Sequence, residues 1–209
     1  MGVTMRNLLL ILLLFLVACA ESINKVNVSD NFKIQNSATL AILNFKTTGL
    51  PANIGEKVAE KFSVEIVQTK KFKIIDRSNI NKIFEEIGFQ GNLDTLGGLD
   101  EKSKIKIRQL GAQYFMSGAV FSFEEKRRYD DNLVLYSKVH ITAKIINIET
   151  GEVVWGAERM KDSKAINAGD RKPKSMMKVE IAAKSADKLL DEIVSEMTDN
   201  ILKQLKNNK

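Results

Sequence analysis

The sequence contains only one cysteine, Cys19, and only one histidine, His140. A single cysteine excludes an intramolecular disulfide and a zinc site built from several thiolates. A single histidine excludes a site with several imidazole ligands, and the residue spacing of a calcium-binding EF-hand is missing. The sequence therefore predicts neither a metal nor another cofactor.

The short motifs of common enzyme classes are also missing. The chain has no G-x-S-x-G, G-x-G-x-x-G or G-K-[ST] segment, so Gly97-Gly98 lies in no phosphate-binding context. Glu85-Glu86 and Glu124-Glu125 are adjacent carboxylates that point in different directions, which favours surface charge over acid–base catalysis. His140 falls on the polar face of an alternating segment, where we expect a solvated surface residue. We predict no catalytic residue, no enzymatic activity and no small-molecule substrate.

The one cysteine stands at the end of an apolar run near the N-terminus. Leu16, Val17, Ala18 and Cys19 place Leu at −3, a small residue at −1 and Cys at +1, which is the pattern of a bacterial lipobox. Maturation needs the thiol to receive diacylglycerol, and small residues to let the signal peptidase reach the preceding bond. We predict a signal peptide over 1–18, cleavage between Ala18 and Cys19, and an S-diacylglycerol, N-acylated Cys19 as the membrane anchor.

Other interpretations of this run fit less well. Leu8 to Ala18 is 11 residues, or roughly 16 Å of helix at about 1.5 Å per residue, whereas a bilayer core is about 30 Å thick. A buried core helix agrees poorly with Arg6 before the run and Cys19 after it. An ordinary secretory signal shares the basic start and short apolar core, but the lone cysteine at the cleavage boundary favours the lipoprotein.

The chain that remains, from Cys19 to Lys209, has 191 residues, the length of one domain of ordinary size or of one domain plus a tail. Arg6 is the only charged residue before Cys19, so the remaining chain has 31 basic and 26 acidic residues, a formal charge of +5. Acids and bases alternate, as in Glu56-Lys57, which is typical of a solvated surface. No aromatic stacking motif accompanies the basic residues, so a nucleic-acid partner is not indicated.

Hydrophobic periodicity predicts a polar tether over 19–37, with room for a short edge strand, and one α/β domain over 38–206. The domain is expected to hold a mixed sheet of about five strands packed by helices, ending in a long C-terminal helix. The predicted strands are 38–46, 71–76, 114–123, 133–148 and 153–158, and the predicted helices are 54–69, 78–87, 100–110 and 179–206. Segments 124–132 and 160–177 are expected to be a charged connection and a polar loop. Trp155 is expected at the sheet edge, with contact to a partner as the alternative.

Four segments resemble a known group of envelope lipoproteins: ATLAILNF, KFKIIDRSNINKIFEEIGFQ, LGAQYFMSGAV and KIINIETGEVVWGAE. They are similar to the curli-secretion, CsgG-type family and to the related penicillin-binding-protein activators of the LpoB type. The resemblance spans about Ala38 to Glu158. It implies a CsgG-like α/β sandwich and a non-enzymatic, lipidated protein that faces the periplasm.

The resemblance implies two candidate functions. The first is assembly or export of surface components through contacts with envelope proteins or with further copies of the chain. The second is activation of a peptidoglycan synthase, although a tether of under twenty residues without proline counts against it. A secretion pore is disfavoured because segments 124–131 and 160–177 are charged, and Lys or Arg on a lipid face costs about 2–4 kcal/mol at midplane. Ala20 is not the inner-membrane retention residue of enteric bacteria, which favours the outer membrane.

Overall fold

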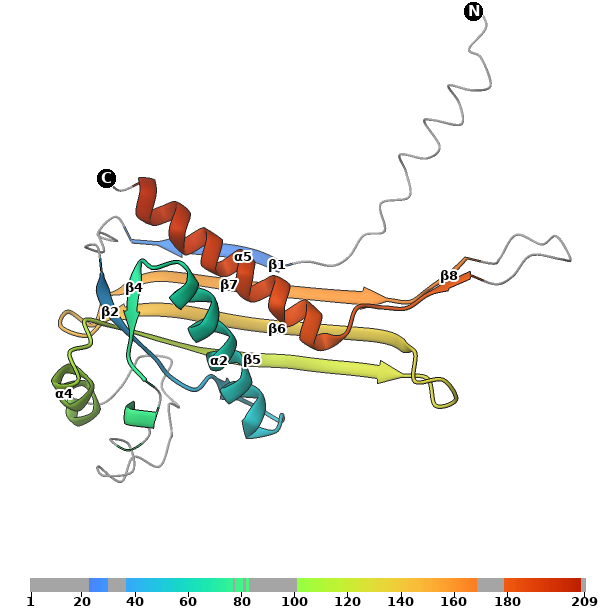
Figure 1. Ribbon diagram of the computed structural model, residues 1–209, viewed down its shortest axis with the longest axis horizontal. Coiled ribbons are helices and arrows are strands. Elements are labelled where there is room, and N and C mark those ends of the chain that lie inside the picture. The colour runs from blue at the N-terminus through green and yellow to red at the C-terminus, as the bar shows by residue number, and fades with distance from the viewer. Residues whose placement is uncertain are drawn as a thin grey trace, which may run out of the picture.

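The computed structural model describes residues 23–29, 37–76, 78–80, 82, 101–168 and 179–207. These form a mixed seven-stranded sheet with helices packed on it, which confirms the predicted α/β class (Figure 1). The strands of the sheet are β1 (Ile23–Val28), β2 (Ala38–Ile42), β3 (Lys46–Thr47), β4 (Phe72–Ile74), β5 (Tyr114–Arg127), β6 (Val134–Asn147) and β7 (Val153–Lys164). The helices are α2 (Ala52–Gln68), α4 (Glu101–Gln109) and α5 (Ala186–Asn207), and β8 (Ile166–Ala168) pairs with β9 (Val179–Ile181) as a separate ribbon.

The sheet has an antiparallel half and a parallel half. Its order is β1-β7-β6-β5-β2-β4, with β3 also beside β5. The pairs β1/β7, β7/β6 and β6/β5 are antiparallel, whereas β2 and β3 run parallel to β5, and β4 runs parallel to β2. The three longest strands, β5 to β7, extend well past α2 toward the ribbon (Figure 1).

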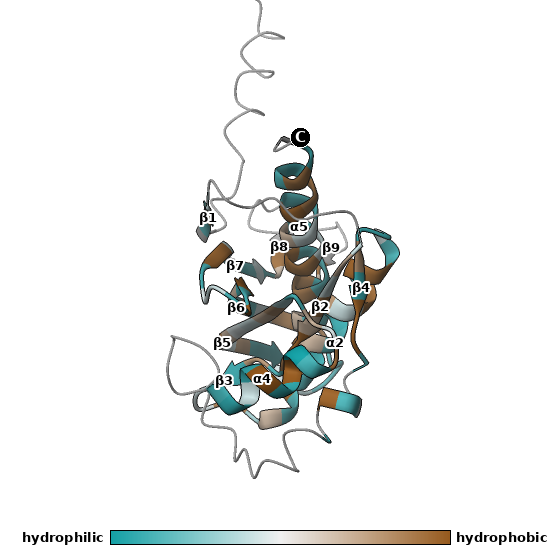
Figure 2. Ribbon diagram, turned by 90° about the vertical axis from the view of Figure 1, so that its left-hand side faces the viewer, coloured by the Kyte–Doolittle hydropathy of each residue, from teal (hydrophilic) through white to brown (hydrophobic). Residues whose placement is uncertain are grey.

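One face of the sheet is buried beneath α2 and α5, which lie side by side (Figure 2). Residues 139, 141, 143 and 145 of β6 all point to this face, as their alternation predicts, and all are buried. The helices contribute apolar residues at three- and four-residue spacing: Val58, Phe62, Ile66, Leu190, Ile193, Val194, Met197 and Ile201. Ion pairs from Lys57 to Asp187, at 3.0 Å, and from Lys61 to Asp191 join the two helices at their exposed edges.

A smaller core lies on the opposite face, at the end of the sheet where β5 begins. Side chains alternate along a strand, so Phe115 faces away from Met116 and packs with Ile107 of α4 and with Ile146. Helix α4 thereby covers one end of this second face. The helix predicted over 78–87 is described at residues 78–80 and 82, and the rest of it lies outside the described residues.

The predicted C-terminal helix starts later than the sequence indicates. Residues 179–181 pair with β8, and α5 begins at Ala186. Two groups satisfy its first amides: the Glu125 carboxylate accepts from the Ala186 N–H at 2.7 Å, and Ser185 Oγ accepts from the Lys188 N–H at 3.2 Å. The first amides of a helix have no intrahelical partner. Because Glu125 and Ser185 supply acceptors at this point, α5 begins at Ala186.

Several strands are longer, or more numerous, than predicted. The charged segment 124–127 continues β5, and residues 160–164 continue β7 instead of starting a loop. The cause is cross-strand pairing: Glu124 lies opposite Lys138, which lies opposite Asp162, so opposite charges alternate across three strands. Residues 23–28 form β1 at the sheet edge, in the segment where the predicted tether has room for a short edge strand.

A close approach at Gly55 generates a stability prediction. The Phe45 N–H donates to the Gly55 carbonyl at 3.2 Å, and a Cβ at Gly55 would collide with the Phe45 carbonyl oxygen. At an open helical site, Gly→Ala stabilises by up to about 1 kcal/mol. Here we expect Gly55→Ala to lower the free energy of unfolding by about 1–3 kcal/mol, measured by urea denaturation.

The matched control is Asn53→Ala, at an exposed position of the same helix turn, for which we expect a change within about 0.5 kcal/mol. An unchanged or raised stability of Gly55→Ala would show that the collision relaxes without cost.

Candidate interaction surface

The residues predicted to carry lipid lie outside the described part of the chain. These are Cys19 and the preceding lipobox residues Leu16, Val17 and Ala18. Glu85-Glu86 and Gly97-Gly98 also fall outside the described residues. The lipobox and the lipidation of Cys19 therefore remain predictions from the sequence.

Trp155 and the pair Glu124-Glu125, in contrast, lie within the described residues, and neither is where the sequence predicts it. Trp155 is not at the sheet edge: its side chain is fully buried beneath α5, and its indole Nε1–H donates to Asn200 Oδ1 at 3.0 Å. A buried indole N–H needs such a partner, so Trp155 is not available to a binding partner. Glu124-Glu125 lies within β5 and not in a loop, and Glu125 also contacts Arg127.

His140 is half-buried and ion-paired, which corrects the expectation of a solvated side chain. Its Nε2 lies 2.9 Å from Glu158 Oε1, and its side chain is 19% exposed. Lys25 Nζ approaches the other oxygen of the same carboxylate at 3.3 Å. These contacts join β6, β7 and β1. The sequence places His140 on the polar face, which is correct, but it could not show that Glu158 and Lys25 meet there.

These residues belong to the part of the second sheet face that α4 does not reach, which we call the open face. It is formed by Lys25, Ala119, Phe121, His140, Thr142, Lys144, Gly156 and Glu158. The strand register places Ala119, Thr142, Glu158 and Lys25 in one row across four strands. Among the described helices, α2 and α5 lie on the other side of these strands (Figure 2).

An aromatic side chain of the open face lies at a β-bulge. Val120 lies opposite Ile141 and Ser122 opposite His140, so Phe121 is the extra residue of β5. Alternation from Ala119 places Phe121 on the open face, and the bulge brings both Phe121 and Ser122 opposite His140. The Phe121 ring lies 5.0 Å from the His140 ring, centroid to centroid, and is 53% exposed. Period-two alternation along β5 gives no sign of this extra residue, so the sequence does not reveal it.

Charge on the open face is organised around Glu158. The hydrogen bond from His140, followed by the contact with Lys25, holds the pKa of Glu158 below its usual value. Burial lowers the pKa of Lys144. An exposed aromatic ring beside paired charges, on a floor of small residues, is suited to contact with another protein.

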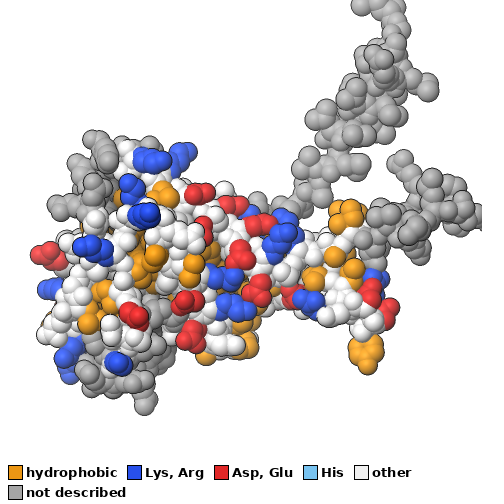
Figure 3. All heavy atoms as spheres, in the orientation of Figure 1, with side chains coloured by type: hydrophobic (Ala, Val, Ile, Leu, Met, Phe, Trp, Pro, Cys, Tyr) orange, Lys and Arg blue, Asp and Glu red, His pale blue; other side chains and the backbone are white. Residues whose placement is uncertain are grey.

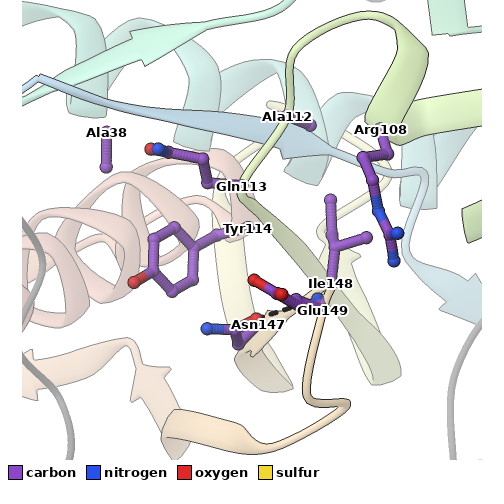
Figure 4. A pocket seen from close by; sticks show the side chains of 8 residues that line it. All are labelled: Ala38, Arg108, Ala112, Gln113, Tyr114, Asn147, Ile148 and Glu149. Carbon is purple, nitrogen blue, oxygen red and sulfur yellow. Dashed lines mark hydrogen bonds between the residues drawn. The ribbon is translucent and has the colours of Figure 1, made fainter.

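A pocket lies at the end of the sheet where β5 begins. This pocket of about 390 Å³ is lined by Ala38, Arg108, Ala112, Gln113, Tyr114, Asn147, Ile148 and Glu149. Figure 4 shows the Arg108 guanidinium and the Tyr114 ring on opposite sides, with Glu149 between them. Asn147 Oδ1 accepts from the Glu149 and Thr150 amides, so it holds the turn. The described lining residues do not pair a nucleophile with a base.

Two further searches cover the described residues only. No helix there is long and apolar enough to cross a membrane. No three His, Cys, Asp or Glu side chains come together there as a metal site would require.

Comparison with known proteins yields one family match. The family described as "Peptidoglycan-synthase activator LpoB" matches residues 44–160, which run from the end of β2 into β7. No curated protein matches the chain. The match supports the LpoB type, and no comparison supports the CsgG-type family.

Solved structures show a similar fold at low identity. Lipoprotein GNA1162 from Neisseria meningitidis is 11% identical, with a TM-score of 0.51 over 79% of this chain and 99% of that chain. The PelC dodecamer from Paraburkholderia phytofirmans is 14% identical, with a TM-score of 0.49 over 84% of this chain and 95% of that chain. The C-terminal domain of LpoB from Escherichia coli is 18% identical, with a TM-score of 0.41 over 61% and 84%. Only the likeness to GNA1162 has a TM-score above 0.5 among these three, and at 11% identity it concerns the fold alone.

The family match, by contrast, spans 117 of 209 residues and includes α2, β4, α4, β5, β6 and most of β7. Because it covers more than half of the chain, this protein belongs to the LpoB family of peptidoglycan-synthase activators.

Proposed function

We propose that this protein activates a peptidoglycan synthase by binding to it, without catalysing a reaction itself. The observation that carries the proposal is the family match over residues 44–160. Synthase activation is the second of the two candidate functions that the sequence resemblance implies. It is better supported than assembly or export of surface components, which rests on the CsgG-type resemblance alone.

The proposed place of action is the cell envelope. Cys19 would carry the lipid and hold the domain on the periplasmic side of a membrane, with Ala20 favouring the outer membrane. A short connection to the lipid then requires the synthase to present its contact surface close to the anchoring membrane. This placement is supported by the lipobox sequence, in which the single cysteine stands at the end of the apolar run.

The open face is the surface that we assign to the synthase. The opposite face is occupied by α2 and α5, whereas Phe121, beside the His140 ring, is 53% exposed. Aromatic side chains in the centre of a charged rim are frequent binding hot spots. Phe121, His140 and Glu158 also lie inside the family match.

Activation is tested with purified components. We expect the full-length lipoprotein in mild detergent to raise the rate of glycan polymerisation by a bifunctional penicillin-binding protein of the same organism several-fold, measured with fluorescent lipid II. No change at saturating lipoprotein, together with loss of a surface component on gene deletion, would instead favour the export function.

The open face is tested by Phe121→Ser. We expect its affinity for the synthase to fall about tenfold or more, equivalent to about 1.4 kcal/mol, because the exposed ring is the central apolar contact. The matched control is Val67→Ser on α2, whose side chain is 52% exposed on the opposite face. Equal losses for the two variants, by calorimetry or surface plasmon resonance, would place the contact elsewhere.

The lipid anchor is tested by Cys19→Ser. We expect this variant to lose incorporation of labelled palmitate and to leave the membrane fraction, because serine has no thiol to accept diacylglycerol. Glu21→Gln, just outside the lipobox, should retain both properties. Membrane association of Cys19→Ser equal to that of the wild type would show that the lipid is not the anchor.

A further inference from the structure

The chain between the proposed anchor and the fold is very short. Strand β1 begins at Ile23, where it pairs with Met160 of β7. Only residues 20–22 separate it from Cys19. An extended chain advances at most about 3.6 Å per residue, so the Cα atom of Cys19 lies within roughly 14 Å of that of Ile23. If Cys19 carries lipid, as proposed above, the sheet lies directly at the membrane surface.

The start of β1 also fixes which end of the sheet is near the lipid. From Met160, β7 runs four more residues to Lys164 and leads into β8. At about 3.3 Å per residue, Ile166 is roughly 20 Å along the chain from Met160. Figure 1 shows that β1 begins at its end nearer to β8 and runs away from β8. The β8–β9 ribbon is therefore the part of the molecule that extends beyond the anchoring point.

The β8–β9 ribbon exposes an apolar pair. Ile166 and Ile181 lie directly opposite each other, and each side chain is 55% exposed. Tyr129, in the turn between β5 and β6 at the same end, is fully exposed. Figure 3 shows hydrophobic surface at this end of the molecule. A two-stranded ribbon is marginally stable in water on its own, so exposed isoleucines on both strands call for a covering surface.

The chemistry around the pair matches a lipid headgroup layer. The side chain of Lys164, the last residue of β7, is 74% exposed, with Asp162 at 4.0 Å. That of Lys184, after β9, is 48% exposed and contacts Glu192 at 2.7 Å. Exposed lysines beside aliphatic side chains favour anionic lipid surfaces, and tyrosine is enriched at the membrane interface. A protein partner would explain the apolar pair, but not its placement beside the anchor.

We propose that Ile166, Ile181 and Tyr129 insert into the headgroup region of the bilayer that holds Cys19. The β8–β9 end is then a second membrane contact, which fixes the orientation of the domain on the membrane. The lipid supplies attachment, and the ribbon supplies the orientation. The proposal rests on lipidation of Cys19 and not on the identity of the synthase.

The experiment places a polarity-sensitive fluorophore on the ribbon of the full lipidated protein. Because the Cys19 thiol is consumed by lipid, Ile166→Cys or Ile181→Cys introduces the one reactive thiol, which is labelled with an NBD group. The labelled protein is reconstituted into vesicles of phosphatidylethanolamine and phosphatidylglycerol. Ile105→Cys on α4, where the native side chain is 50% exposed, is the matched control.

We expect blue-shifted emission at positions 166 and 181, with quenching by brominated lipids, and neither effect at position 105. Water-like emission at all three positions, in protein whose lipid is verified by mass spectrometry, would overturn the membrane contact and leave the anchor intact. Protein that lacks the lipid would overturn both. A blue shift that appears only on adding synthase, or only at high protein concentration, would assign the ribbon to a protein partner or to a second copy and would also overturn the proposal.

A double variant gives a readout that does not depend on labelling. Ile166→Ser combined with Ile181→Ser should speed transfer of the lipidated protein between vesicles at least several-fold, whereas Ile105→Ser should not. Circular dichroism checks that the double variant keeps its fold. Equal transfer rates for the folded double variant and the wild type would contradict insertion.

Discussion

The burial of one sheet face beneath α2 and α5 is the constraint on which the rest of the structure depends. Trp155 is part of this buried face, and because it is fully buried its indole N–H must be satisfied within the fold, here by Asn200 of α5. The helix in turn needs acceptors for its first amides, and the end of β5 supplies Glu125. The position of α5 on the core therefore depends on the length of β5, because the end of that strand carries the acceptor for the first amide of the helix.

Among the described helices, α2 and α5 cover one face of the sheet, so the second face is the one that we assign to a partner. Helix α4 covers the end of that second face near Phe115, and Phe121 is exposed beyond it, beside the one-residue bulge. The Lys25–Glu158–His140 contacts hold the edge strand β1 to β7 and β6 on the same face. The proposed partner site and the attachment of the edge strand therefore share residues.

The class of the fold and most of its strands follow from the sequence because burial imposes a period. Alternation predicts β6 almost to the residue, and the spacing of Val58, Phe62 and Ile66 predicts α2. Features that depend on distant partners do not follow. Strand β9 forms because β8 pairs with it. The register shift beside Phe121 leaves no periodic signal.

The pairing of β1 with β7 has a consequence for biogenesis. Residues about 130 positions apart must meet before the sheet edge closes, and α5, which follows β7 in the sequence, must cover Trp155. Pairing over such a sequence separation slows folding. If the chain is exported, as proposed above, the sheet edge can close only after β7 has emerged, and Trp155 can be covered only after α5 has followed.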